Sequence, residues 1–346
     1  MPTMKQAVLY SPNDIRVEDV EIPGLEPGDV LLKVTAALLC GTDVRIYSGR
    51  KTKNVTLPSV LGHEIAGEVV DCNGELPDGV HVGDQVCVYP LVPCGACVAC
   101  RKGHANICRN RVAFGYQLAG GLSQYIRVPA AARQNLVPLN NVPAQVAALV
   151  EPLACALNGQ NLAEVVGADA ILIIGCGPLG LMHIRLAKAQ GIPKVIAVEP
   201  NQARHQIAID SGADLVLTPS DTAAQQILEF SDGGIDVVIM AIGRVEALAP
   251  YMGILAPGAR ISAFAGFPSD ALLSIVANDI HYNEWKVVGA SSCRLENFTA
   301  IAPMVADGRL QLADIVGTQL ALSDTVAALD LVASGRDLRV GVNPWL

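Results

Sequence analysis

Four cysteines within fifteen residues constrain this chain more strongly than any other feature of its sequence. Cys94, Cys97, Cys100 and Cys108 are separated by two, two and seven residues. Four thiolates at such spacing can surround one divalent metal as a tetrahedron, with Zn–S distances of about 2.3 Å. Because four protein ligands leave no position open for a substrate, the pattern predicts a structural zinc site.

Two disulfides are the alternative for these four cysteines, and the rest of the sequence does not favour them. The first ten residues contain no apolar segment of the kind that directs secretion. The longest apolar stretch, residues 170–182, is interrupted by three glycines and a proline and is too short to cross a bilayer. We therefore expect a cytoplasmic protein with reduced thiols.

Length and composition favour a large folded protein. The 346 residues are enough for two domains, and 51% of them are hydrophobic while only 16% are charged. This composition supports sizeable cores and argues against disorder. The formal net charge of −9 is spread along the chain, which disfavours nucleic acid and anionic membranes as partners.

The N-terminal part, up to about residue 150, is rich in short β-forming runs. Turn sequences containing glycine, proline and asparagine separate these runs. A series of short strands of this kind predicts a partly open all-β barrel or a sandwich. The predicted strands are residues 7–10, 29–36, 68–71, 85–88 and 125–128.

The middle part, from about residue 150 to 290, changes to alternating strands and helices. The apolar run 171–174 leads into the sequence Gly-Cys-Gly-Pro-Leu-Gly at residues 175–180, and an apolar helix is expected over 181–190. A second strand, 194–198, ends at Glu199. A G-x-G-x-x-G turn between a strand and a helix, with an acid after the next strand, predicts a dinucleotide-binding Rossmann domain.

Glu199 favours NAD over NADP as the cofactor. Its carboxylate can accept hydrogen bonds from the adenosine ribose hydroxyls, and it would repel a 2′-phosphate. Arg204, five residues further on, could bind such a phosphate and keeps NADP as an alternative.

Two shorter motifs are weak alone and gain weight together. They are Cys40-Gly41-Thr42-Asp43 and Gly62-His63-Glu64-Ile65-Ala66-Gly67. A lone cysteine is usually a small core residue, and a lone histidine more often packs than binds a metal. With the four-cysteine segment and the nucleotide turn, however, the chain resembles the zinc-dependent medium-chain dehydrogenase family, in its polyol (sorbitol) dehydrogenase-like branch. The resemblance extends over essentially the whole chain.

The resemblance implies a fold of class α/β with two domains. A GroES-like, partly open β-barrel catalytic domain would comprise residues 1–149 and 291–346. A Rossmann domain, with its doubly wound sheet, would comprise residues 150–290. The C-terminal segment would contribute helices over 298–307 and 323–334 and a strand over 338–342.

The resemblance also implies a second, catalytic zinc. Cys40 and His63 would bind it, Glu151 would be the third ligand, and Glu64 would be a direct or a reserve ligand with a catalytic role. Asp43 would orient the ring of His63, and Thr42 would pass on the proton of the alcohol. Alternatively, Glu151 caps a helix or reaches the metal through water, and the Thr42 hydroxyl only stabilises a turn. Cofactor contacts are implied for Gly175, Gly177, Pro178, Leu179, Gly180, Glu199 and Arg204.

One position departs from many relatives, which carry a histidine two residues after the aspartate of the first motif. Here that residue is Arg45, whose guanidinium stays protonated and cannot act as a base. The proton would then leave Thr42 through the cofactor ribose and water, or through another group. Arg45 could instead contact the cofactor phosphates or a polar substrate.

Together these features predict an NAD-dependent zinc enzyme that oxidises a secondary alcohol of a polyol or sugar alcohol, reversibly, to the ketone. A threonine or other alcohol dehydrogenase of the same family is the nearest alternative. A relative that binds nucleotide without catalysis is a third. We expect a small-molecule alcohol as the partner, no nucleic acid or membrane, and a homodimer or homotetramer.

Overall fold

A computed structural model describes residues 2–346; Met1, at which the first predicted domain begins, lies outside the described residues. The chain divides into two compact units. The first contains the chain up to Ala154 together with Arg294–Leu346, and the second is Cys155–Cys293. The predicted boundaries at residues 149 and 290 lie within a few residues of these limits. Each unit has its own sheets and core.

The first unit is built mainly from antiparallel strands. Its largest sheet has the order β10-β6-β5-β3-β18-β17, with β9 also paired to β3, and two smaller sheets have the orders β2-β1-β4 and β7-β8. The strands are β1 (Thr3–Ser11), β2 (Asp14–Glu21), β3 (Val30–Leu39), β4 (Ser59–Val60), β5 (Glu64–Cys72), β6 (Gln85–Val88), β7 (Leu91–Val92), β8 (Val112–Ala113), β9 (Tyr125–Val128), β10 (Leu136–Pro138), β17 (Val316–Ala321) and β18 (Arg339–Asn343).

Strand β3 is the centre of the large sheet. Its residues Val30, Leu32 and Val34 are fully buried and alternate with half-buried side chains, as expected for a strand with one face on the core. Antiparallel neighbours flank it on both sides, since Leu38 pairs with Glu64 of β5 and Leu39 pairs with Val340 of β18. The start of β5 and the start of β18 therefore lie on either side of the end of β3.

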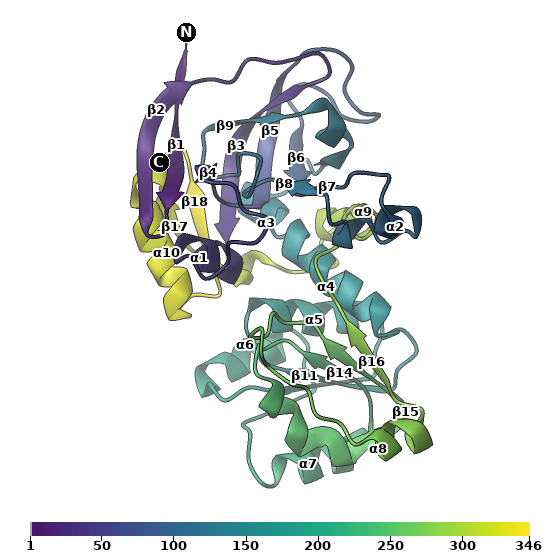
Figure 1. The fold of residues 1–346 in the computed structure, drawn as a ribbon. Coiled ribbons are helices and arrows are strands. Elements are labelled where there is room, and N and C mark those ends of the chain that lie inside the picture. The colour runs from purple at the N-terminus through teal and green to yellow at the C-terminus, as the bar shows by residue number, and fades with distance from the viewer. Residues whose placement is uncertain (1) are drawn as a thin grey trace. The chain divides into compact units, whose positions relative to one another are not determined.

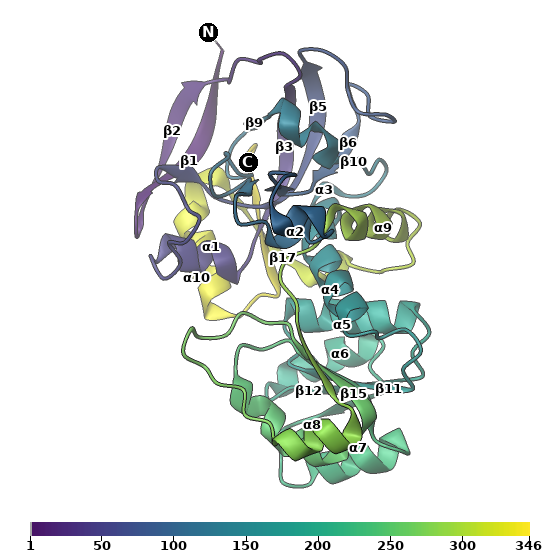
Figure 2. The ribbon, with the colours of Figure 1, turned by 45° about the vertical axis from the view of Figure 1, so that its right-hand side comes forward.

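The C-terminal segment belongs to the first unit. Helix α10 (Thr325–Ser334) lies beside α1 (Gly41–Tyr47), as Figure 1 and Figure 2 both show. The predicted C-terminal helices and strand are present, as α9 (Leu295–Ala306), α10 and β18. The remaining helices of this unit are the short α2 (Val98–Arg101) and α3 (Ala144–Ala148).

The second unit is a doubly wound α/β domain. All neighbouring strands of its six-stranded sheet are parallel, in the order β13-β12-β11-β14-β15-β16. Helices α5 and α6 lie on one face of the sheet, and α7 and α8 lie on the other (Figure 2). The strands are β11 (Ala170–Ile174), β12 (Lys194–Val198), β13 (Leu215–Leu217), β14 (Ile235–Met240), β15 (Leu255–Ala263) and β16 (Lys286–Gly289). The helices are α5 (Pro178–Ala189), α6 (His205–Asp210), α7 (Ala223–Ser231) and α8 (Ala277–Asn283).

The continuous apolar run that predicted the first Rossmann strand is explained by burial on both faces. All five residues of β11 are buried, as is usual for the central strand of a parallel sheet. Helix α4 (Val150–Leu162) carries the chain from the first unit into the second. Among residues 2–346, no helix combines the length and apolar character that crossing a bilayer requires.

Candidate active site and metal centres

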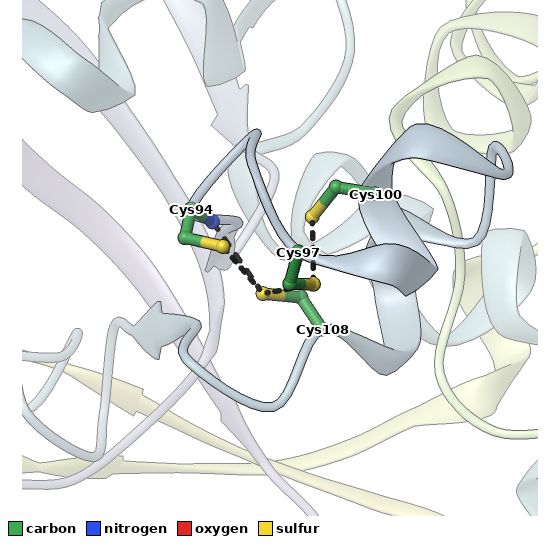
Figure 3. A group of neighbouring side chains, drawn as sticks. All are labelled: Cys94, Cys97, Cys100 and Cys108. Atoms are coloured by element: carbon green, nitrogen blue, oxygen red, sulfur yellow. Dashed lines mark hydrogen bonds between the residues drawn. The ribbon is translucent and has the colours of Figure 1, made fainter.

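The four predicted structural cysteines converge on one point (Figure 3). Their sulfur atoms lie 3.5 Å apart in the pairs Cys97–Cys100 and Cys94–Cys108, and 3.7 Å apart in the pair Cys97–Cys108. All four are free thiols. A tetrahedron with Zn–S bonds of about 2.3 Å has S···S edges of about 3.8 Å, whereas a disulfide needs about 2.05 Å. The spacing therefore suits a tetrahedral metal site.

The electrostatics of this cluster also suit a cation. The backbone N–H of Cys100 lowers the pKa of the Cys97 thiol to about 6, whereas desolvation raises the pKa of the Cys100 thiol to about 12. Neighbouring thiols that shift in opposite directions cannot all ionise unaided, because each new thiolate repels the next. A divalent cation at the centre would stabilise all four thiolates together.

A second cluster forms where α1 begins. Cys40 is the N-cap of α1, and its Sγ accepts the backbone N–H of Thr42 at 3.3 Å. The same Sγ lies 3.4 Å from Nε2 of His63. A tetrahedral zinc bound by one sulfur and one imidazole nitrogen would separate those two atoms by about 3.5 Å. Cys40 and His63 thus present their ligand atoms at a suitable separation.

Asp43 supports this arrangement from behind. It is fully buried, and it accepts the backbone N–H groups of Cys40 at 3.0 Å and Gly62 at 3.2 Å. Its Oδ1 also lies 3.4 Å from Nδ1 of His63. Burial disfavours charge on both groups, but their mutual attraction lowers the pKa of Asp43 and raises the pKa of His63. The contact leaves Nε2 as the ring nitrogen that faces Cys40.

Two glutamates complete the cluster around His63. Ligand atoms of His63, Glu64 and Glu151 lie within 4.8 Å of one another, and those of Cys40, Asp43 and His63 do so as well. Burial raises the pKa of Glu64 to about 7, and the charge of Arg339 opposes that shift. Arg339 lies 3.1 Å from Oε1 of Glu64. The predicted catalytic ligands therefore form two overlapping groups within the first unit, and His63 belongs to both.

The expected helix cap at Glu151 is wrong in one detail. Helix α3 ends at Ala148 and α4 already begins at Val150, so that Glu151 lies in the first turn of α4. The cap was expected because the next residue, Pro152, suits the first position of a helix, and that local argument cannot show that one helix follows another almost directly. The carboxylate still lies at the positive end of the helix dipole, which favours its ionised form.

Polar residues that the sequence did not single out lie next to this cluster. Lys51 Nζ donates to the Tyr116 hydroxyl at 3.1 Å and lies 4.9 Å from the centre of its ring. The Tyr116 ring in turn lies 5.8 Å from the ring of His63. Burial raises the pKa of Tyr116 to about 12, and it lowers the pKa of Lys51. Neither residue belongs to a motif, so only the fold could reveal them.

Thr42 and Arg45 lie on the first turns of α1. The Arg45 guanidinium donates to the Thr42 hydroxyl oxygen, with an Nη2···Oγ1 distance of 3.0 Å. Arg45 therefore occupies an acceptor position of the hydroxyl and leaves its O–H free to donate elsewhere. Arg45 Nε is buried and has no hydrogen-bond partner within the described residues.

The nucleotide turn of the second unit has the geometry that its sequence predicts. Gly175 has a φ of +100°, and Gly177 is the N-cap of α5. A Cβ on Gly180 would lie 1.9 Å from the carbonyl oxygen of Gly175, so no side chain fits there. Pro178 and Leu179 open α5. Helix α5, which is 12 residues long, therefore presents free backbone N–H groups at its N-terminus, and these suit an anion.

Glu199 follows β12 and is buried beside this turn. Its carboxylate accepts the backbone N–H of Cys176 at 2.7 Å and that of Asn201 at 2.9 Å. Nε2 of His205 lies 2.8 Å from the Glu199 carbonyl oxygen. Arg204 lies in the short 3₁₀ helix η3 (Gln202–Arg204) that follows. The acid at the end of the second strand and the glycine turn are thus directly connected.

An antiparallel β unit with a four-cysteine segment, joined to a parallel unit with a nucleotide turn, defines a two-domain zinc dehydrogenase. Comparison with known proteins agrees. The alcohol dehydrogenase GroES-like domain family matches residues 26–141, and the zinc-binding dehydrogenase family matches residues 178–307.

Individual relatives match along most of their length. An L-threonine 3-dehydrogenase of Pyrococcus furiosus is 34% identical over 86% of each chain. An erythritol/L-threitol dehydrogenase of Mycolicibacterium smegmatis is 31% identical over 96% of this chain and 95% of its own. A zinc-binding dehydrogenase of Sinorhizobium meliloti, solved with NADP, has a TM-score of 0.91 at 28% identity and covers 99% of this chain and 100% of its own.

The chain therefore belongs to the zinc-dependent medium-chain dehydrogenase family, with a GroES-like domain and a Rossmann domain as predicted. It is a zinc alcohol dehydrogenase that uses a nicotinamide cofactor.

Proposed function

We propose that the enzyme oxidises a secondary alcohol of a polyol or sugar alcohol with NAD, reversibly, to the ketone. The observation that carries the proposal is a pair of overlapping groups of ligand atoms in the first unit, Cys40 with His63 and His63 with Glu64 and Glu151, which share His63. A glutamate rather than a cysteine at position 151 is typical of polyol dehydrogenases, which this chain resembles. The erythritol/L-threitol dehydrogenase among the relatives supports the same substrate class.

Cys40, His63 and Glu151 would hold the catalytic zinc, with Glu64 as a further or reserve ligand, and the four-cysteine cluster would hold the structural one. A zinc ion at the catalytic position supplies Lewis acidity, which makes a hydroxyl group a stronger acid. Asp43 fixes the ring of His63 so that Nε2 faces the metal position. The donor set of one thiolate, one imidazole and carboxylates suits zinc.

Thr42 is the residue that we propose to take the proton of the substrate. Its hydroxyl oxygen already accepts a hydrogen bond from Arg45, and Arg45 cannot accept a proton. Thr42 must therefore pass the proton to a group other than Arg45. The guanidinium holds the Thr42 hydroxyl in one orientation and places a positive charge beside it.

We propose NAD rather than NADP as the cofactor. The buried Glu199 carboxylate beside the glycine turn would accept the ribose hydroxyls and repel a 2′-phosphate. The alternative cofactor is NADP, with which the structurally similar relative from Sinorhizobium meliloti was solved. A comparison of kcat/KM for the two cofactors decides it.

The substrate proposal is tested by following NADH absorbance over a panel of polyols, sugars and hydroxy amino acids. Strong turnover of threonine with none of any polyol would contradict it and would favour the activity named for the 34% identical relative. Zinc content separates enzyme from scaffold, because an active enzyme should hold two ions per chain and a non-catalytic relative only one.

Glu151→Ala tests the site itself. We expect turnover to fall at least about 100-fold, as when a catalytic metal loses a ligand or its supporting partner, while the fold is retained. A matched variant is Glu246→Ala, because Glu246 is an exposed acid of the second unit with 70% of its side chain accessible. Full activity in Glu151→Ala would remove this residue from the proposed site.

We also propose that the chain assembles as a homodimer or homotetramer. Strand β16 is an edge of the parallel sheet, and Leu272 and Tyr282 of the same unit are 82% and 77% exposed. An open strand edge and exposed apolar side chains each favour association. Sedimentation equilibrium at several concentrations tests this assembly.

A further inference from the structure

Two cations of the first unit, Lys51 and Arg45, lie beside the candidate catalytic centre and have no carboxylate partner among residues 2–346. Lys51 contacts a neutral phenol, Tyr116, and Arg45 contacts a neutral hydroxyl, Thr42. Within residues 2–346, neither of them forms an ion pair, whereas other cations of this unit, such as Arg127, do. Arg45 also keeps its Nε buried and without a partner in the same described range. Both residues are half-buried.

Each of these cations is one contact away from the reacting groups. Arg45 donates to Thr42, the proposed proton acceptor. Lys51 donates to Tyr116, whose ring lies 5.8 Å from that of the proposed zinc ligand His63. The two positive charges also act on each other, since the charge of Arg45 disfavours the charged form of Lys51. Two charges of like sign thus border one small region.

Two half-buried cations close to each other are unfavourable when no anion is bound between them. Partial burial removes water from a cation, and a second cation nearby adds repulsion. The nearby negative groups are already used, because Asp43 binds two backbone N–H groups and faces His63, and Cys40 faces Nε2 of His63. The chain as a whole carries a net charge of −9, so an anion would find attraction only at a local cluster of this kind.

We propose that the substrate carries a carboxylate as well as the secondary alcohol, and that Lys51, with Tyr116 and Arg45, binds that carboxylate. The substrate would then be a polyhydroxy compound that also bears an acid group, such as an aldonate. This inference rests on the proposed function, because it refines the substrate of the same site. Lys51 supplies an ammonium, and the Tyr116 hydroxyl, whose oxygen accepts from Lys51, can donate its own O–H to a carboxylate oxygen.

The pyrophosphate of the cofactor is the other anion to consider. It already has a binding turn of its own in the second unit, where the glycine loop leads into the N-terminus of α5. Lys51 and Tyr116, by contrast, adjoin a proposed ligand of the catalytic metal. A carboxylate on the reacting molecule therefore explains their position better than a phosphate of the cofactor.

The test compares an aldonate with the sugar alcohol of the same chain length, on the zinc-loaded enzyme with saturating NAD. Kinetics are measured for the wild type, Lys51→Gln, Lys51→Arg and Lys53→Gln. Lys53 is a matched control because it is an exposed lysine of the same loop. Calorimetric titration of each compound into the enzyme with NADH gives binding without the need for turnover. The KM for NAD is measured in every variant.

We expect the wild type to prefer the aldonate, and Lys51→Gln to lower its kcat/KM by about 10- to 100-fold, mainly through KM, as for loss of a charged hydrogen bond. The sugar alcohol should change by less than about threefold, Lys51→Arg should restore most of the loss, and Lys53→Gln should match the wild type.

Equal or better use of the sugar alcohol by the wild type would overturn the inference and leave the proposed function intact. A rise in the KM for NAD in Lys51→Gln, with the substrate preference unchanged, would overturn it in favour of a cofactor contact. If no alcohol is oxidised at all, the proposed function fails, and calorimetry still decides the inference. Lys51-dependent binding of the aldonate alone supports it, and equal or absent binding of the two compounds overturns it.

Discussion

The guanidinium of Arg339 lies 3.1 Å from a carboxylate oxygen of Glu64, and both side chains are buried. Arg339 begins β18 and Glu64 begins β5, and these two strands lie on either side of β3. The C-terminal strand thereby places a fixed positive charge behind a carboxylate of the candidate catalytic cluster. Removal of one partner of a buried pair leaves the other charge without compensation.

We therefore expect Arg339→Met to destabilise the protein by about 3 kcal/mol or more at pH 8, where Glu64 is ionised. The pKa of Glu64 is about 7 with Arg339 present and will rise without it. The loss should consequently be smaller at pH 6, where the carboxyl group can take up a proton. Urea unfolding of the metal-free protein at the two pH values measures the difference.

Arg309→Met is the control for that comparison. Arg309 pairs with Asp307 at 2.9 Å, but 58% and 50% of the two side chains are exposed. An exposed pair of this kind contributes less than about 1 kcal/mol. Equal losses of unfolding free energy in the two variants would show that the buried pair stabilises the protein no more than the exposed pair does.

His183 should make the second unit sensitive to acid. It is fully buried, its ring packs edge-on against Phe264 with 4.4 Å between centroids, and neither ring nitrogen has a partner within residues 2–346. Burial lowers its pKa from 6.5 to about 3. Since the unfolded chain binds this proton more readily, stability is complete above pH 6.5 and falls as the pH drops from 6.5 towards 3.

The expected loss from this one group is about 1.4 kcal/mol per pH unit within that window. His183→Leu cannot take up the proton and should lose correspondingly less stability between pH 6.5 and 5. Urea midpoints of the wild type and the variant, measured across this range, give the comparison. Parallel pH profiles for the two proteins would mean that His183 is not the group responsible.

Cys100→Ser should remove the structural metal and spare the catalytic one. One thiolate is lost from the tetrahedron, and structural zinc sites supply folding free energy directly. We expect the zinc content to fall from two ions to one per chain, and proteolysis to become faster within residues 94–108. Elemental analysis and limited digestion followed by mass spectrometry measure both effects.

Cys72→Ser is the matched variant for this experiment, because Cys72 lies on β5 outside both clusters and its thiol donates to the Gly74 carbonyl oxygen at 3.3 Å. A serine hydroxyl can make the same contact. Two zinc ions in both variants would refute a metal at the four-cysteine cluster.

Glu199→Ala should weaken the preference for NAD. The substitution removes the carboxylate that would repel a 2′-phosphate, and it also removes the acceptor of the Cys176 and Asn201 N–H groups. We expect the ratio of kcat/KM for NAD to that for NADP to fall by about tenfold or more, equivalent to about 1.4 kcal/mol. An unchanged ratio would assign cofactor choice to other residues.

Features that depend only on residues close together in the sequence could be predicted from it. The strands at 85–88, 125–128 and 194–198 have the predicted bounds. Glycines 175, 177 and 180 lie on the predicted turn, because only residues without a side chain fit its backbone and the approach of α5. By contrast, β2 was not predicted, since its charged edge-strand sequence lacks the apolar alternation on which strand prediction depends.

The sequence by itself determined which atoms could bind a metal, because the cysteine spacing and the glycine turn are properties of short segments. Only the tertiary structure decided what surrounds them. The strands of Glu64 and Arg339 are the two neighbours of β3 in the sheet, and this arrangement brings the two side chains together. Lys51 contacts Tyr116, which comes from a distant loop and lies next to His63. Such contacts follow from strand order and packing, and residues far apart in the chain carry no local pattern that announces them.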